Sequence, residues 1–311
     1  MSDTNLGVAG GDTTSHVDRL PRRIDLHTHS TASDGLYTPA ELVRMASTAG
    51  LDLIALTDHD STAGIDEAHA TGAGLGVSVV AGIEINTDLP SGGVAHVLGY
   101  HLDWRHDAFQ GALEELRAAR ERRAIRMVEK LNQVGLDITW ARVRALAQGA
   151  VGRPHIAQAL IEKGHATSVS DAFDRWLSKG RPGFVPRVRV LPEDAVRLIR
   201  GARGVPSLAH PAYIQTLEDD LLPRLVAAGL LGLETYYGEY PPETVERLKG
   251  LADRHGLIPT GGSDYHGPGL HPTPLGGRFV PPEVAERLGQ AAEELRQAPA
   301  PGFALELPEE E

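Results

Sequence analysis

The segment Ile24–Gly35 (IDLHTHSTASDG) has an aspartate and two histidines at alternate positions, followed five residues later by another aspartate. On a β-strand, Asp25, His27 and His29 would all point to one face. Imidazole is a common protein ligand for zinc, iron and manganese, and a carboxylate beside it can orient the ring. This spacing is compatible with metal binding, with Asp25 in a position to orient a histidine. Two alternating histidines often occur by chance, however, so the motif alone does not decide for a metal site.

Further candidate ligands follow apolar runs later in the chain. With the first segment they form a set of nine nitrogen and oxygen ligands: His27, His29, Asp34, His59, Glu84, His96, His210, Asp264 and His266. Each follows an apolar run, and α/β barrels build their sites where strands end. A chance cluster is therefore a poor explanation, and we predict one metal centre.

Seven apolar runs are predicted to be the strands that position these ligands. They are IDLHTH, LDLIALTDHD, VSVVAGIEI, VAHVLGYHL, GVPSLAHPA, LLGLETYYG and GLIPTGGSDYHG. The first helix between them has Thr38 as N-cap, Pro39 at N1 and Glu41 at N3. Alternating strands and helices imply a mostly parallel sheet. We predict the α/β class, a seven-stranded (β/α) barrel that is irregular where the link NTDLPSGG is too short for a crossover helix.

The strand pattern stops over residues 103–191. Four helix-like segments stand there: FQGALEELRAARERRAIRMVEKLNQVG, ITWARVRALAQG, RPHIAQALIEKG and VSDAFDRWLSKG. We predict an inserted helical domain that caps the substrate, because an insertion at this end of a barrel would roof the site. Residues 23–102 and 192–305 then form a discontinuous barrel, and residues 1–22 a disordered leader.

Composition excludes several kinds of protein. The chain of 311 residues has no cysteine, so disulfides, thiolate ligands and a cysteine nucleophile are impossible. A net charge of -12 argues against long duplex nucleic acid as a partner. No apolar run approaches the roughly 20 residues of a membrane span, and the N-terminus lacks the apolar centre of a signal peptide. We therefore expect a cytoplasmic protein without a membrane partner.

The motifs DLHTHSTASDG, LTDHDS, GIEI, AHPA and GSDYHG, in this order, resemble those of the PHP (polymerase and histidinol phosphatase) family. The resemblance runs from Ile24 to about Gly267 and implies a PHP-type barrel and a metal-dependent phosphoesterase. Within the insertion, GRPHIAQAL and KGRPGFVPR are similar to the branch that contains 3',5'-nucleoside bisphosphate phosphatases and a 5'-3' exoribonuclease.

The resemblance also implies three divalent ions, which could be manganese, iron or zinc. His27, His29, Glu84 and Asp264 would hold the first ion. The second would take Glu84, His96 and His210, and the third Asp34, His59 and His266. Glu84 would bridge the first two ions and act with Asp264 and His266 in catalysis.

Neighbouring ions can share a bridging hydroxide that attacks a phosphate ester in line. The resemblance implies a nucleotide phosphate monoester as substrate: a 3',5'-nucleoside bisphosphate or a short 5'-phosphorylated oligonucleotide. Hydrolysis of histidinol phosphate or of a cyclic phosphate is the alternative. A metal-dependent amidohydrolase fits less well, because such a barrel usually has a carboxylated lysine where Glu84 stands. The chain also lacks the polymerase segments that a polymerase-associated module would have.

Arg153 is the main candidate for substrate binding. It precedes Pro154 at a predicted helix start, where free N–H groups and a partial positive charge favour an anion. A guanidinium there could hold a phosphate through two hydrogen bonds. Four more residues of the insertion could add to the pocket, or could equally be ordinary solvated groups: His155, Lys179, Arg181 and Arg187.

Overall fold

The computed structural model describes residues 22–90, 92–147, 151–186 and 190–299, so residues 1–21 of the predicted leader lie outside the described residues. Seven strands form one sheet in chain order. They are β1 (Ile24–Thr28), β2 (Leu53–Leu56), β3 (Ser78–Asp88), β4 (Val94–Tyr100), β5 (Val205–Leu208), β6 (Gly232–Tyr237) and β7 (Ile258–Gly262). The predicted fold class is confirmed: the sheet is a nearly closed α/β barrel.

The barrel is irregular at β4, as predicted. This strand runs antiparallel to both neighbours, β3 and β5, whereas the other adjacent pairs in the order are parallel. A short link of this kind can only join antiparallel strands. The segment after β7 returns to β1, where the Asp264 N–H donates to the His27 carbonyl at 2.9 Å. This contact brings the two ends of the sheet together.

Helices cover the outside of the barrel. They are α1 (Pro39–Thr48), α2 (Ile65–Leu75), α7 (Pro192–Gly201), α8 (Leu222–Ala228), α9 (Pro242–His255) and α10 (Glu283–Gln297). The predicted start of α1 is confirmed, because Thr38 and Glu41 form a reciprocal capping box. No helix within the described ranges has both the length and the apolar character of a membrane span. The cytoplasmic location stays a prediction.

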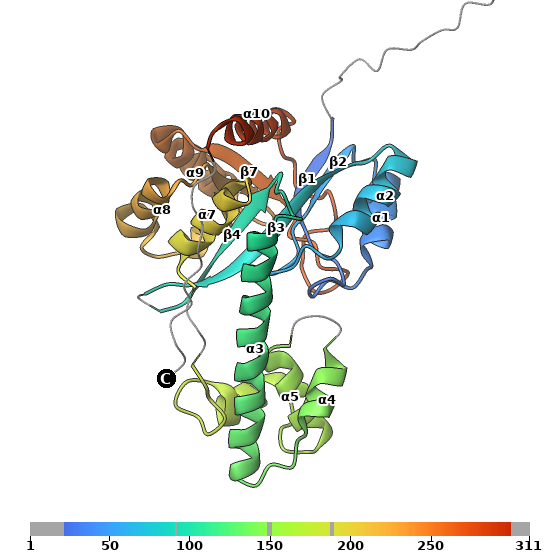
Figure 1. Ribbon diagram of the computed structural model, residues 1–311, viewed down its shortest axis with the longest axis vertical. Coiled ribbons are helices and arrows are strands. Elements are labelled where there is room, and N and C mark those ends of the chain that lie inside the picture. The colour runs from blue at the N-terminus through green and yellow to red at the C-terminus, as the bar shows by residue number, and fades with distance from the viewer. Residues whose placement is uncertain (1–21, 91, 148–150, 187–189, 300–311) are drawn as a thin grey trace, which may run out of the picture.

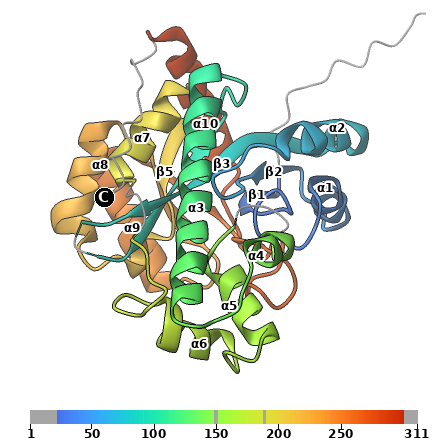
Figure 2. The ribbon, with the colours of Figure 1, turned by 60° about the horizontal axis from the view of Figure 1, so that its bottom comes forward.

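The insertion forms a lobe below the barrel (Figure 1). It contains α3 (Asp107–Gln133), α4 (Trp140–Leu146), α5 (Arg153–Glu162), α6 (Val169–Ala172) and a π-helical turn (Phe173–Leu177). Its buried apolar side chains, among them Leu131, Ile156 and Leu160, form a cluster of their own. The start of α3 instead places Phe109 and Leu113 in the barrel core. The long helix α3 therefore belongs to both cores and joins the lobe to the barrel (Figure 2).

Candidate metal centre

The barrel gathers all nine candidate ligands at one end, around the carboxylate of Glu84 on β3. One of its oxygens, Oε1, lies 2.9 Å from His96 Nδ1 and 3.2 Å from His210 Nε2. The other, Oε2, lies 3.0 Å from His59 Nδ1 and 3.3 Å from His29 Nε2. The two oxygens thus face different groups of histidines, as a carboxylate shared between two ions would.

Groups of ligand atoms within 4.8 Å of one another show which side chains could share an ion. One group is the predicted first set: His27, His29, Glu84 and Asp264. A second contains the predicted third set with one addition: Asp34, His59, His266 and His29. The predicted set of Glu84, His96 and His210 differs most, because the group found here has His59 in place of His210. His210 still contacts Glu84, so it belongs to the same centre.

Several buried ligand atoms in this centre make no hydrogen bond: His27 Nε2, His29 Nδ1, His29 Nε2 and Asp264 Oδ1. His27 Nε2 and His29 Nε2 each lie 3.2 Å from Asp264 Oδ1. Buried polar atoms are rarely left without a partner, because each loses its hydration. Cations placed among them would satisfy them, and the nitrogen and oxygen donors suit divalent metals. The residues present therefore fit a metal centre.

The charges of these groups depend strongly on one another. Burial alone would raise the pKa of Glu84, but His59, His96 and His27 outweigh it and hold that pKa well below its usual range. Burial lowers the pKa of His59 to about 4, although Glu84 opposes this change. A carboxylate kept ionised beside a histidine kept neutral presents free electron pairs to a cation.

Two candidate ligands have unusual backbone conformations. His210 has φ of 29° and Asp264 has φ of 56°, which is left-handed backbone that residues other than glycine seldom adopt. Such conformations cost roughly 1–3 kcal/mol each and tend to occur at functional sites. His210 follows β5 and Asp264 follows β7. In both places the backbone turns directly after the strand, and the side chain points into the end of the barrel. The strain is therefore consistent with a role in the centre.

Glu234 on β6 is a buried carboxylate that the sequence analysis missed. Its Oε1 lies 2.8 Å from His27 Nδ1, and its Oε2 accepts the backbone N–H of His210 at 2.7 Å. A carboxylate in this position fixes the ring so that its other nitrogen faces the ligand cluster. The available signal was a glutamate inside the apolar strand run LLGLETYYG.

The role assigned to Asp25 needs correction. Its carboxylate accepts hydrogen bonds from the Ser263 hydroxyl at 2.6 Å and from the Gly276 N–H at 2.8 Å. Its contact with His27 is to the backbone N–H, at 3.4 Å, and Glu234 holds the His27 ring instead. Asp25 therefore fastens the loops after β7 to β1. Alternation along the strand predicts only the face on which Asp25 lies. It cannot show that the His27 ring contacts Glu234 on β6 rather than Asp25.

Three further side chains support the centre without having been predicted. Asp58 accepts from the Ser30 N–H at 2.7 Å and the Ser33 hydroxyl at 2.6 Å, and burial raises its pKa to about 6. Tyr237 donates to Asp264 Oδ2 at 2.9 Å. His271 Nε2 lies 3.4 Å from the same oxygen. Asp58 and Tyr237 thus hold the loops with Asp34 and Asp264 from outside the ligand set, whereas His271 also forms a group with Asp264 and His266 that could hold an ion.

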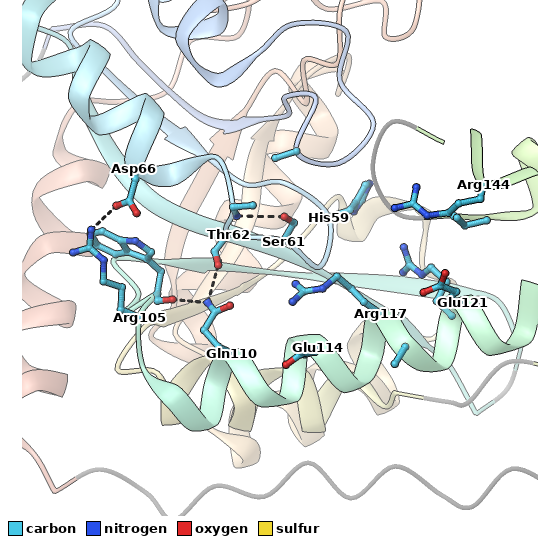
Figure 3. Close-up of a pocket in the computed structure, with 16 residues that line it drawn as sticks. His59, Ser61, Thr62, Asp66, Arg105, Gln110, Glu114, Arg117, Glu121 and Arg144 are labelled. Carbon is cyan, nitrogen blue, oxygen red and sulfur yellow. Dashed lines mark hydrogen bonds and ion pairs between the residues drawn. The ribbon is translucent and has the colours of Figure 1, made fainter. Parts of the chain in front are cut away.

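A pocket of about 790 Å³ opens beside the centre, between α3 and the loop that follows β2 (Figure 3). His59 lines it on the side of the metal centre, Arg117 projects from α3 and Arg144 from α4. At its far end, Arg105 and Asp66 form an ion pair at 2.7 Å. Its size lies in the range of small-molecule sites. A ligand there would contact both the barrel and the insertion.

The predicted substrate residues lie elsewhere in the insertion. The Arg153 guanidinium stacks over the Phe173 ring at 5.1 Å, at the start of α5. His155 accepts the Gly152 N–H at 3.0 Å, and its pKa is lowered by burial, while the charge of Asp34 in the metal centre opposes this shift. Lys179 and Arg181 are exposed. None of these four lines the pocket, and Arg187 lies outside the described residues.

Histidines and carboxylates gathered at one end of an α/β barrel are typical of metal-dependent hydrolases. Comparison with known proteins identifies the family of this chain. The PHP domain matches residues 25–178. A 3',5'-nucleoside bisphosphate phosphatase of Chromobacterium violaceum is 33% identical over 258 residues, 79% of this chain and 88% of the relative. The 5'-3' exoribonuclease Rnm of Salmonella typhimurium is 35% identical, over 86% of this chain and 88% of the relative.

A solved structure agrees with these relatives. It belongs to a Bifidobacterium adolescentis protein assigned as a metal-dependent phosphoesterase, which is 35% identical with a TM-score of 0.74. The match covers 88% of this chain and 98% of that protein. The chain belongs to the PHP family and is a metal-dependent phosphoesterase.

Proposed function

We propose that the protein hydrolyses a phosphate monoester of a nucleotide, with three divalent ions of manganese, iron or zinc. The substrate is a 3',5'-nucleoside bisphosphate or a short 5'-phosphorylated oligonucleotide, as the names of the relatives suggest. The main support for a centre with several ions is Glu84, whose two carboxylate oxygens face different groups of histidines. The pocket beside His59 supports a substrate larger than phosphate alone.

The residues of the chain prepare the site for this reaction. Bound divalent ions would neutralise the phosphoryl oxygens and activate the attacking water. Glu234 holds His27 and Tyr237 holds Asp264, so these ligands are oriented before a substrate arrives. Their burial keeps bulk water from competing for the donors.

The uncleaved part of the substrate occupies the pocket, in this proposal. Arg117 and Arg144 enter it from α3 and α4 and can hold an anion there. Arg153, His155, Lys179 and Arg181 remain proposed contacts for a substrate long enough to reach α5 and the segment that follows it. Burial lowers the pKa of His155 and the negative charge of Asp34 acts against this shift, which supports this extension.

A substrate panel tests the proposal. Protein loaded with Mn²⁺, Fe²⁺ or Zn²⁺ and protein stripped of metal are assayed on nucleoside bisphosphates, 5'-phosphorylated oligonucleotides, histidinol phosphate, cyclic phosphates and amides. We expect the highest kcat/KM for a nucleotide monoester, and only in the loaded protein. Turnover of amides with inert nucleotides would contradict the proposal. Fewer than two ions per chain by elemental analysis would contradict the three-ion centre.

A further inference from the structure

Asp60 lies where the insertion meets the barrel, directly after His59. It is buried and has φ of 48°, a left-handed conformation that aspartate and asparagine tolerate better than most residues. Its Oδ1 accepts the Asn86 N–H at 3.1 Å, and its Oδ2 accepts the Asn86 side-chain amide at 3.0 Å. The guanidinium of Arg120, from α3, forms an ion pair with the same Oδ2. A buried carboxylate thus joins the insertion helix to β3.

The contact continues from Asn86 to the metal centre. Asn86 stands two residues after Glu84 on β3, so both side chains point to the same face. The Asn86 amide nitrogen lies 3.3 Å from His59 Nδ1. On its other side, His59 Nε2 lies 3.8 Å from Asp34 Oδ2. Together with Glu84, whose Oε2 lies 3.0 Å from the same His59 nitrogen, Asn86 sets the direction in which the His59 ring faces Asp34.

We propose that Arg120, Asp60 and Asn86 are positioning residues through which the insertion helix α3 fixes His59 for the ion of Asp34, His59 and His266. This inference rests on the proposed function, because His59 must be a metal ligand. The side chain of His59 is 16% exposed at the pocket, whereas those of His27 and His29 are fully enclosed, so packing alone restricts the His59 ring less than theirs. Removal of Arg120 leaves the Asp60 carboxylate buried without its cation, which is costly.

Three substitutions test this arrangement in the full chain: Arg120→Met, Asp60→Asn and Asn86→Ala. Asp60→Asn removes the charge but keeps a residue that tolerates the left-handed backbone. Arg122→Met is the matched control, because Arg122 lies on the same helix and pairs with Glu115 at the surface. Each protein is stripped of metal and titrated with Mn²⁺, and the number of bound ions per chain is measured at each step. Thermal unfolding is measured on the metal-free proteins.

We expect the three variants to bind one of three ions about 10- to 100-fold more weakly and the other two as in the wild type, because losing a support of this kind weakens metal binding to that extent. Arg120→Lys, which keeps a cation for Asp60, should recover part of the affinity. Unchanged affinity for all three ions with a lower melting temperature would mean that the contact only anchors the insertion, and would overturn the inference. A wild type that binds no metal would instead overturn the proposed function, and the inference with it.

Discussion

The barrel end and the insertion lobe use charged residues in opposite ways. At the barrel end, Glu84 and Glu234 are almost fully buried and contact several partners. In the lobe, charged pairs such as Arg142 with Glu162 and Lys163 with Asp137 lie on the surface over an apolar core. Buried charges cost free energy unless they are paired or bind a metal. The comparison indicates that the barrel end is built for chemistry and that the lobe is held together mainly by its apolar core. Contact of the lobe with substrate stays a prediction.

The largest effect should come from Glu84→Gln. Loss of one charge shared by two groups of histidines should lower kcat/KM by about 10³-fold or more, equivalent to about 4 kcal/mol. Activity and ions per chain are measured together. Glu243→Gln, at the exposed start of α9, is the control and should change neither. A Glu84→Gln protein with all its metals and full activity would contradict the conclusion that the buried carboxylates of the barrel end serve the chemistry.

In the lobe, the largest effect should be on stability. Leu160 is fully buried in the lobe core, so Leu160→Ala should destabilise the protein by about 2–5 kcal/mol. Denaturant unfolding of the metal-free protein measures this loss. Val169→Ala, at a half-exposed position of the lobe, should change stability by less than about 0.5 kcal/mol. Apart from the contact of Arg120 with Asp60, the lobe is not expected to affect metal binding. Loss of metal by a Leu160→Ala protein that stays folded would therefore contradict this division of roles.

Glu234→Gln should act on the metal centre without contacting substrate. The glutamine keeps the size of the side chain but weakens the hold on the His27 ring, so metal affinity should fall about 10- to 100-fold. Titration with Mn²⁺, followed by elemental analysis, measures the change. Excess metal should restore most of the activity, in contrast to Glu84→Gln. Equal loss of activity at every metal concentration would place Glu234 in catalysis itself.

Arg153→Ala and Arg117→Ala compare two possible positions of the second phosphate. Losing one charge-assisted contact should cost about 1.5–3 kcal/mol, or roughly 10- to 100-fold in kcat/KM, on a nucleoside bisphosphate. An aryl phosphate, which has no second phosphate, should be affected far less. The variant with the larger difference between the two substrates identifies the contact. Equal losses on both substrates would indicate a role in folding or catalysis for that residue.

The smallest effect should be that of Asp137 on the lobe surface. Hydrogen bonds from Lys163 and then His165 lower the pKa of Asp137 to about 2. A lowered carboxyl pKa stabilises the fold above the unfolded value of about 3.9, and this stabilisation is lost as the pH falls toward 2. The melting temperature of Asp137→Asn should therefore lie slightly below that of the wild type at pH 6, and the difference should shrink below pH 4. A difference that grows on acidification would contradict this assignment.

Local patterns in the sequence were sufficient for most of the fold. The seven strands follow from short apolar runs, and the start of α1 from the spacing of Thr38 and Glu41. The irregularity at β4 follows from the length of one link. Each of these features depends on residues close together in the chain. The nine candidate ligands were also chosen from the sequence, because polar residues at the ends of apolar strands stand out.

Tertiary structure alone decided the partners of Glu234, Arg120 and Asp25. Glu234 reaches His27 across 207 positions of the chain, and Arg120 reaches Asp60 across 60. The partners of Asp25 lie in loops after β7 rather than on the His27 ring. Sequence periodicity gives the face on which a side chain lies. Its partner depends on how strands and helices far apart in the chain pack and on which rotamer that packing leaves open.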